Sequence, residues 1–398
     1  MSIRTAPAVG LVTAAALLGD TLLYSALPVS AARLGLDALA VGLALSLNRW
    51  VRLLTNPFAA RLYERFPAGA LILVALALGV ASTALYALPT ALAVFLAARL
   101  VWGMSWSLLR LGTLLSAIEG AAGRAGRALG EMRAVYGLGY VGGAIYAPFA
   151  VESFGWGGAA LGAAALTLLL GIGPALTVAD WRREVDVDER EEEAVRRSLV
   201  DPRFLGLFAV AAIQYGIYAG IIAVGGGLRI AEIFPDGAAV LAVPTAATVI
   251  AGLFVLTQRI SQVAWTPFAG RFADRSLTAT FLASTVLAVA SMLALVITRD
   301  ATAFIALGAV AFFGGITSVV ALELAIAHRT TAADRPRILG AYNTWADAGA
   351  AAGALGAGFL ALAGTQVPFA SAALLAGATL AAAPTIGLRT VAVGASAR

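Results

Sequence analysis

The sequence repeats itself, and this repeat limits the possible folds more than any other feature. The segment NPFAARLYERF at 56–66 returns as TPFAGRFADRS at 266–276, an offset of 210 residues. The same offset relates further identical residues: Arg49 and Arg259, Arg127 and Arg337, Leu129 and Leu339, Gly130 and Gly340, Gly139 and Gly349, and Gly143 and Gly353. Several matches in one register predict two copies of a unit of roughly 200 residues.

Apolar residues dominate the composition. They make up 61% of the chain and charged residues 12%, with a mean hydropathy of +0.90, whereas soluble domains have about 45–50% and about 25%. This excludes a soluble globular fold and predicts a protein that crosses a membrane many times. The bilayer core is about 30 Å thick, so each crossing needs about 20 mostly apolar residues. Because backbone amides must be satisfied within each segment, we expect helices rather than strands.

Apolar runs separated by charges and turn residues give about six segments in each copy. In the first copy they fall at 7–29, 37–57, 69–89, 91–115, 132–151 and 157–178. In the second they fall at 204–228, 241–265, 277–297, 302–326, 339–362 and 366–387. The predicted fold class is an all-α integral membrane protein with twelve transmembrane helices in two pseudo-symmetric six-helix bundles. These bundles cover 1–178 and 204–398, and a cytoplasmic linker at 179–203 joins them.

Charges in the connecting loops predict the orientation. An even number of spans puts both termini on one side, and most loop arginines share that side, whereas Arg33, Arg229 and Arg299 fall opposite. By the positive-inside rule both termini are cytoplasmic, and we expect a multi-pass protein of the cytoplasmic (inner) membrane. The apolar run at the N-terminus is too long for a cleaved signal peptide, and more spans follow it.

The repeated segment falls between the second and third predicted spans of each copy, on a short cytoplasmic loop. It resembles the loop signature of the major facilitator superfamily, G-x-L-x-D-R-x-G-R-R, at Gly270, Phe272, Asp274 and Arg275 and at Ala60, Leu62, Glu64 and Arg65. An acid just past a span can meet the positive end of a neighbouring helix. We expect Glu64, Arg65, Gly270, Asp274 and Arg275 to gate the cytoplasmic side, with Glu64 near the start of the eleventh span and Asp274 near the start of the fifth. The alternative is an acid and arginine pair that only sets topology.

Two shorter patterns resemble elements of the same superfamily. Arg99 and Gly103 in the fourth span are similar to its R-x-x-x-G element, and Gly139 and Gly143 in the fifth are similar to its glycine-rich antiporter motif. In the family, the arginine of the fourth span is associated with proton coupling. The resemblance covers the whole chain and implies two bundles related by an axis along the membrane normal, with the substrate bound near the midplane.

Ionisable side chains within the spans are candidates for function, because each costs roughly 2.5–3.5 kcal/mol at the bilayer centre on insertion scales. Asp20 lies in the middle of the first span and is a candidate for proton uptake or for a cationic solute; the alternative is a pair with a nearby arginine that orders the bundle. Arg49 and Arg259 occupy matching places, where they attract an anion or close a gate, or else reach toward cytoplasmic phosphates. Arg99 lies deeper, where such reaching is harder.

The second half contributes two intramembrane acids, Glu323 and Asp347, both candidates for proton coupling. Asp347 stands among small residues, so that its helix can approach its neighbours closely. Arg52 lies one helical turn from Arg49 but nearer the surface, and we expect a structural role for it. Arg110 lies closer to the cytoplasm than Arg99, and we expect it to pair with acids of the loops.

Other chemistry is not indicated. GLGYVG at 137–142 fits a dinucleotide-binding pattern but lies inside an apolar run without a preceding strand, so close helix packing explains it better. The single histidine, His328, has no second ligand in view, and no nucleophile with a base, P-loop or metal spacing occurs. We therefore expect no enzyme, cofactor, metal site or ATP-driven pump. The arginines are scattered among loops, which argues against nucleic acid as a partner.

The interpretation is a secondary active transporter that moves a small organic solute across the membrane by alternating access, with protons as the driving ion. Arginines outnumber acids in the spans, which favours an anionic or zwitterionic solute. Asp20 keeps open the alternative of multidrug efflux of amphipathic cations by proton antiport. A membrane sensor that transports nothing and a lipid flippase on the same scaffold are further alternatives. The expected partners are the solute, protons and the lipid bilayer, and we expect a monomer.

Overall fold

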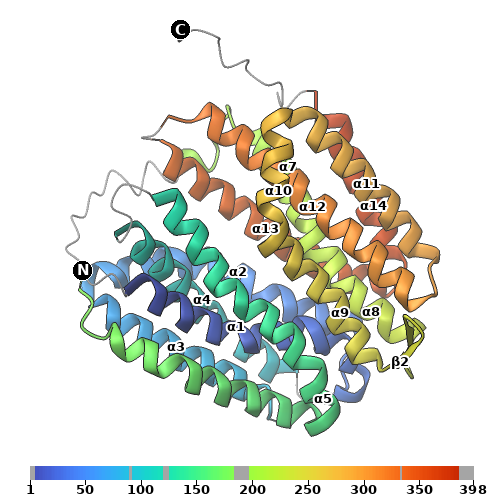
Figure 1. Ribbon diagram of the computed structural model, residues 1–398, viewed down its shortest axis with the longest axis horizontal. Helices are drawn as coiled ribbons and strands as arrows, with labels where there is room; N and C mark the ends of the chain where they lie inside the picture. The colour runs from blue at the N-terminus through green and yellow to red at the C-terminus, as the bar shows by residue number, and fades with distance from the viewer. Residues whose placement is uncertain (1–4, 89–91, 120–124, 183–196, 332–333, 385–398) are drawn as a thin grey trace.

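The computed structural model describes residues 5–88, 92–119, 125–182, 197–331 and 334–384, and helices fill almost all of them (Figure 1). We call the part up to residue 182 the N-half and the part from residue 197 the C-half. The N-half contains α1 (Thr5–Ser30), η1 (Ala32–Leu34), α2 (Ala38–Arg65), α3 (Ala68–Leu85), α4 (Leu92–Glu119) and α5 (Ala125–Thr177). The α5 helix is two helices joined by a kink, where Gly155 has a φ of 67° that suits glycine.

The C-half contains α7 (Leu205–Tyr215), η2 (Gly216–Ile221), α8 (Ile222–Ile233), α9 (Ala247–Ile260), η3 (Ser261–Trp265), α10 (Thr266–Arg275), α11 (Leu277–Ile297), α12 (Ala301–Arg329), α13 (Arg335–Ala361) and α14 (Val367–Ala382). The segments η2 and η3 are π-helical and interrupt two long helices, Leu205–Ile233 and Ala247–Arg275. Such turns are rare and occur often at functional sites.

Eight of the helical segments in the described residues are long and apolar enough to cross a membrane. They are Thr5–Ser30, Ala68–Leu85, Leu92–Glu119, Ala134–Thr177, Leu205–Ile233, Ala247–Arg275, Leu277–Ile297 and Ala301–Arg329. A multi-pass membrane protein follows from these lengths, since each reaches the roughly 20 residues that a bilayer requires.

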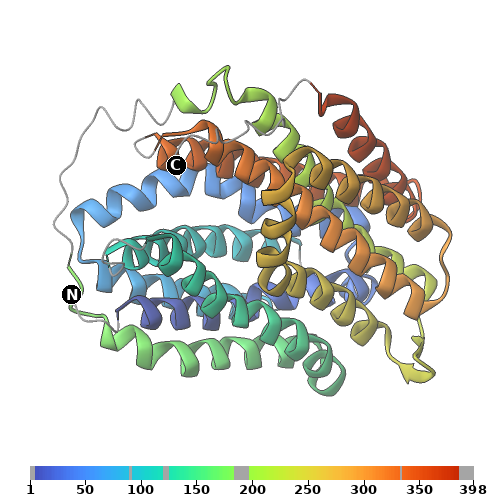
Figure 2. The ribbon, with the colours of Figure 1, turned by 45° about the horizontal axis from the view of Figure 1, so that its top comes forward.

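Helix packing repeats between the halves. In the N-half α1 packs against α5 and α3 packs against α4; in the C-half α7 and η2 pack against α13, and α11 packs against α12. The contacts between halves match as well, since α2 packs on α13 and α9 packs on α5. Figure 2 shows the N-half helices (blue to green) mostly on one side and the C-half helices (yellow to red) on the other.

Two repeated glycines have equivalent neighbours. A side chain at Gly139 would collide with the carbonyl of Ala14, and one at Gly349 would collide with that of Ala212. Ala212 follows Ala14 by 198 residues, so the offset of 210 does not extend to the first helix of each half. The connection to the next helix is longer in the second copy, where it holds a short β-hairpin after α8. The offset of 210 residues therefore applies from α2 and α9 onward.

This hairpin was not predicted, because helices were expected throughout. Strands β1 (Ala238–Val240) and β2 (Val243–Thr245) pair antiparallel, so the predicted span at 241–265 begins too early and the helix starts only at Ala247. Leu241 and Ala242 form the turn with φ of 49° and 66°, a rare conformation for residues other than glycine. The Leu241 amide donates to Thr302 Oγ1 at 2.9 Å, which ties the turn to α12.

The repeated segment also differs from its predicted setting. It is helical rather than a loop: 56–65 completes α2, and 266–275 is α10. The true connections are short, because α3 starts at Ala68 and α11 at Leu277. Pro267 lies in the first turn of α10, directly after the π-helical segment η3. Most of the predicted linker, 183–196, lies outside the described residues.

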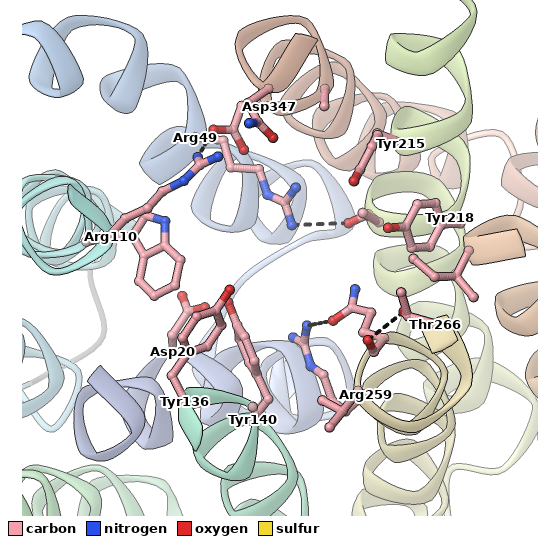
Figure 3. A pocket seen from close by; sticks show the side chains of 18 of the residues that line it. Asp20, Arg49, Arg110, Tyr136, Tyr140, Tyr215, Tyr218, Arg259, Thr266 and Asp347 are labelled. Carbon is pink, nitrogen blue, oxygen red and sulfur yellow. Dashed lines mark hydrogen bonds and ion pairs between the residues drawn. The ribbon is translucent and has the colours of Figure 1, made fainter. Parts of the chain in front are cut away.

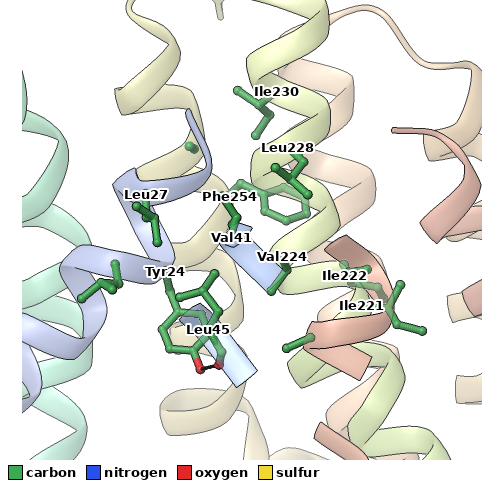
Figure 4. Close-up of a cluster of buried hydrophobic side chains, with 14 of the residues drawn as sticks. Tyr24, Leu27, Val41, Leu45, Ile221, Ile222, Val224, Leu228, Ile230 and Phe254 are labelled. Carbon is green, nitrogen blue, oxygen red and sulfur yellow. Dashed lines mark hydrogen bonds between the residues drawn. The ribbon is translucent and has the colours of Figure 1, made fainter. Parts of the chain in front are cut away.

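The buried core differs between the two ends of the molecule. At the end that holds residues 5–17 and 59–76, the N-half has its own apolar cluster, and residues 204–211, 273–281 and 321–342 form a separate cluster in the C-half. At the opposite end one cluster joins both halves (Figure 4). There Leu27 of α1 and Val41 of α2 pack in one cluster with Leu228 of α8 and Phe254 of α9. The halves are therefore held together chiefly at that end.

Candidate solute-binding cavity

A cavity of about 600 Å³ lies between the halves. Residues of α1, α2, α4 and α5 line one side, and residues of α7, η2, α9, η3, α10, α12 and α13 line the other. Its charged lining residues are Asp20, Arg49, Arg52, Arg110, Arg259, Glu323 and Asp347. This volume suits a small organic molecule, since ligand pockets typically measure about 300–1,000 Å³.

Arg49 and Arg259 both extend into the cavity (Figure 3), as expected from their matching places in the two copies. Arg49 Nε lies 3.4 Å from the Tyr24 hydroxyl, and Arg49 Nη2 donates to the Ala219 carbonyl at 3.4 Å, across the boundary between halves. Arg259 stacks on the Tyr140 ring at 4.4 Å, and its Nη1 lies 3.4 Å from Gln262 Oε1. Within the described chain, neither guanidinium lies within 4.0 Å of a carboxylate oxygen.

Arg52 and Arg110 lie in the same cavity and share one acid of the other half. Arg110 Nη1 donates to Asp347 Oδ2 at 2.8 Å, and Arg52 Nη1 lies 3.7 Å from Asp347 Oδ1. The prediction that Arg110 pairs with loop acids was therefore wrong, because its side chain turns along α4 toward the cavity. Arg52 likewise faces the cavity rather than the surface, with only 7% of the residue exposed.

Asp20 pairs with an arginine, which was one of the two alternatives that the sequence left open for it. Arg99 Nη1 donates to Asp20 Oδ1 at 2.7 Å, and Arg99 Nε donates to the Ala44 carbonyl at 2.9 Å. Arg99 is completely buried, whereas Asp20 keeps an edge on the cavity. The pair lies within the N-half and connects α1, α2 and α4.

Glu323 lies on the opposite wall of the cavity. The Tyr215 hydroxyl donates to Glu323 Oε1 at 3.3 Å. The structure places five of the six predicted coupling residues in the cavity lining: Asp20, Arg49, Arg259, Glu323 and Asp347. The sixth, Arg99, lies behind the wall and contacts Asp20.

Aromatic side chains form much of the remaining wall, and sequence analysis did not single them out. Five tyrosines and two tryptophans line the cavity: Tyr24, Tyr136, Tyr140, Tyr215, Tyr218, Trp102 and Trp106. Trp106 of α4 contacts two tyrosines of α5, with 6.4 Å to Tyr136 and 6.5 Å to Tyr140 between ring centroids. The aromatic residues of α4 and α5 recur four residues apart, which places them on one face of each helix. This spacing is visible in the sequence and would have identified them.

The predicted gating residues lie away from the cavity. Glu64, Arg65, Asp274 and Arg275 are exposed, and Gly270 is half-buried, at the ends of α2 and α10. Arg275 lies over the Phe272 ring at 5.9 Å. In the described residues Glu64 and Asp274 have no hydrogen bond or ion pair, so their gating contacts stay a prediction.

A sequence model of the Major Facilitator Superfamily matches residues 9–263. The chain belongs to this superfamily. Its membership agrees with the resemblance found in the repeated segment and with the helical fold. No curated protein sequence matches the chain.

Solved structures of transporters share this superfamily member's fold at low sequence identity. One is a POT family transporter in complex with 5-aminolevulinic acid, with a TM-score of 0.77 and 13% identity over 96% of this chain and 97% of the other. A nucleoside transporter, NupG, gives 0.78 and 12% over 97% and 100%. The human organic anion transporter MFSD10 gives 0.64 and 18% over 96% and 99%. At these identities the likeness shows the fold alone.

Proposed function

We propose that the chain is a secondary active transporter that moves a small organic anion or zwitterion across the cytoplasmic membrane by alternating access. One observation carries this proposal: Arg49 and Arg259 reach into one cavity from matching positions of the two halves, without a carboxylate partner in the described residues. Guanidinium groups bind carboxylates and phosphates through paired hydrogen bonds. The aromatic wall supplies apolar contact for the rest of the solute.

We also propose that the chain has twelve spans in two six-helix bundles. These bundles cover residues 1–178 and 204–398. The repeated packing of α1 on α5 and of η2 on α13 supports two equivalent bundles. The kink at Gly155 divides α5 into two crossings, and the long helices Leu205–Ile233 and Ala247–Arg275, each with a π-helical segment inside it, each cross once. On this count both chain ends lie on the arginine-rich cytoplasmic side.

We propose that the structure represents the state in which the cavity is open to the cytoplasm. The separate apolar clusters belong to the end near residues 5–17, and the shared cluster belongs to the end near residues 27–45. Rocking of the halves about the cavity would exchange these arrangements. The exposed acids Glu64 and Asp274 would then find the helix ends that we predicted as their partners.

Protons are proposed as the driving ion, with Asp20 and Arg99 as one element of the coupling. A proton on Asp20 and the guanidinium of Arg99 compete for the same carboxylate. Glu323 and Asp347 are the other cavity acids that can take part. The alternative of a cationic solute bound by Asp20 has less support, because Arg99 already neutralises that carboxylate at 2.7 Å.

Binding of matched probes tests the charge preference of the cavity. We expect calorimetry on the purified protein to show benzenesulfonate binding at least tenfold tighter than its neutral analogue benzenesulfonamide, with no binding of phenyltrimethylammonium. Arg259→Gln should weaken benzenesulfonate binding about 10- to 100-fold, because a hydrogen bond to a charged group contributes about 1.5–3 kcal/mol. Arg271→Gln, on the exposed face of α10, is the matched control and should bind as the wild type does. Equal binding of all three probes would contradict the proposal.

A further inference from the structure

We propose that Asp347 is a tethered competitor for the solute: its carboxylate occupies Arg52 and Arg110 in the empty protein, and the anionic group of the solute displaces it. This inference concerns regulation of the same cavity and rests on the anionic solute of the proposed function. It assigns to Asp347 a role different from carrying a proton.

The geometry of Asp347 is that of an anion bound to the cavity arginines. One of its oxygens accepts from Arg110 Nη1 at 2.8 Å, and the other lies 3.7 Å from Arg52 Nη1. The side chain of Asp347 is 16% exposed and that of Arg110 is 37% exposed. The Arg52 side chain is only 8% exposed, so Arg110 is the guanidinium that a dissolved carboxylate or sulfonate can approach first, with Arg52 behind it on the cavity wall.

The charges of the cavity explain why an internal anion is needed. Arg49, Arg52, Arg110 and Arg259 line one space of about 600 Å³. Like charges gathered in one cavity repel one another. Asp347 neutralises part of this charge when no solute is present, and Arg49 also attracts it electrostatically. A solute anion does the same when it binds, so that Asp347 is no longer required there.

The pair of Asp20 and Arg99 provides a contrast within the same structure. Both residues belong to the N-half, and Arg99 is completely buried, so rigid movement of the halves leaves that pair intact. Asp347 belongs to α13 of the C-half, whereas Arg52 and Arg110 belong to α2 and α4 of the N-half. Its ion pairs therefore cross the boundary between the halves, so that movement of the halves acts on them directly.

Displacement of Asp347 links solute binding to this movement. In the empty protein the ion pairs hold α13 to α2 and α4. A bound anion takes over the guanidinium groups and releases α13, which lowers the barrier to rocking only when solute is present. The affinity of the protein for the solute is lower as a result, because the solute must first displace the carboxylate of Asp347.

The inference predicts an increase in affinity when this cavity acid is removed, which is the opposite of what loss of a binding residue gives. We expect Asp347→Asn to bind benzenesulfonate about tenfold tighter than the wild type, measured by calorimetry on the purified full-length protein. Glu323→Gln removes a second carboxylate from the same cavity, so its gain measures the general field of the cavity, and we expect that gain to be smaller than the gain in Asp347→Asn. Asp347→Ser replaces Asp347→Asn if the asparagine variant does not purify as a single species.

Each outcome decides the question. A larger gain in Asp347→Asn than in Glu323→Gln supports the inference, and so does binding that becomes detectable only in the Asp347 variant. Unchanged or weaker binding overturns it, as does an equal gain in Glu323→Gln, which would reflect the general field of the cavity. If neither the wild type nor any variant binds benzenesulfonate, the anion site itself fails, a result that overturns the proposed function and not only the competitor.

Discussion

Arg99→Gln is expected to lower the free energy of unfolding by about 3–5 kcal/mol, since it leaves the buried carboxylate of Asp20 without its partner. The substitution also removes the 2.9 Å hydrogen bond to the Ala44 carbonyl, which joins α4 to α2. Denaturation in mixed detergent micelles, followed by tryptophan fluorescence, measures the effect.

Two controls separate the loss of this pair from other effects. Arg203→Gln removes an exposed ion pair with Asp201 at 2.7 Å and should leave stability unchanged within error. The double variant Asp20→Asn with Arg99→Gln should be more stable than Arg99→Gln alone, because the uncompensated charge is gone. If Arg99→Gln unfolds at the wild-type denaturant concentration, the pair does not hold α1, α2 and α4 together.

Gly358→Leu is expected to abolish transport. Gly358 of α13 packs on α2, and a Cβ atom there would lie 2.9 Å from Gly42 Cα and would collide with the Ala38 carbonyl. These are backbone atoms, so no side-chain rotation relieves the clash, and the halves cannot close at this end. Solute flux in proteoliposomes should fall to that of protein-free vesicles.

Gly356→Leu is the matched control for this substitution. It changes the same helix by the same side chain, but a Cβ atom at Gly356 meets nothing within 4 Å. Spin labels on α2 and α13 should report a larger separation in Gly358→Leu than in Gly356→Leu. Wild-type flux in Gly358→Leu would show that close contact between Gly42 and Gly358 is not needed in the transport cycle.

The repeat in the sequence predicted matching positions in the two halves, including two residues that line the cavity. An offset of 210 residues placed Arg49 and Arg259 at matching depths, and both reach the cavity. It also matched Gly139 with Gly349, and the structure gives these two glycines equivalent neighbours. These features follow from helix periodicity and duplication, which a single sequence displays directly.

Other features depend on contacts between distant residues. Arg110 and Asp347 are 237 positions apart, and nothing in either local segment specifies that they meet. The π-helical segments that bring Tyr218 and Gln262 to the cavity leave no mark in the apolar pattern, because one extra residue in a turn alters it too little. The hairpin at 238–245 is too short to break an apolar run, so that its turn and its second strand were included in the predicted span at 241–265.

The central claim, that the cavity carries an anion across the membrane with protons, is tested most directly by flux into proteoliposomes that contain a pH-sensitive dye. Benzenesulfonate is suitable because it stays charged at all working pH values and does not carry a proton itself. The account predicts that radiolabelled benzenesulfonate enters wild-type vesicles and changes the internal pH, and that Arg49→Gln with Arg259→Gln abolishes both signals. Entry at equal rates in the wild type and the double variant, or entry with no change of internal pH, would contradict it.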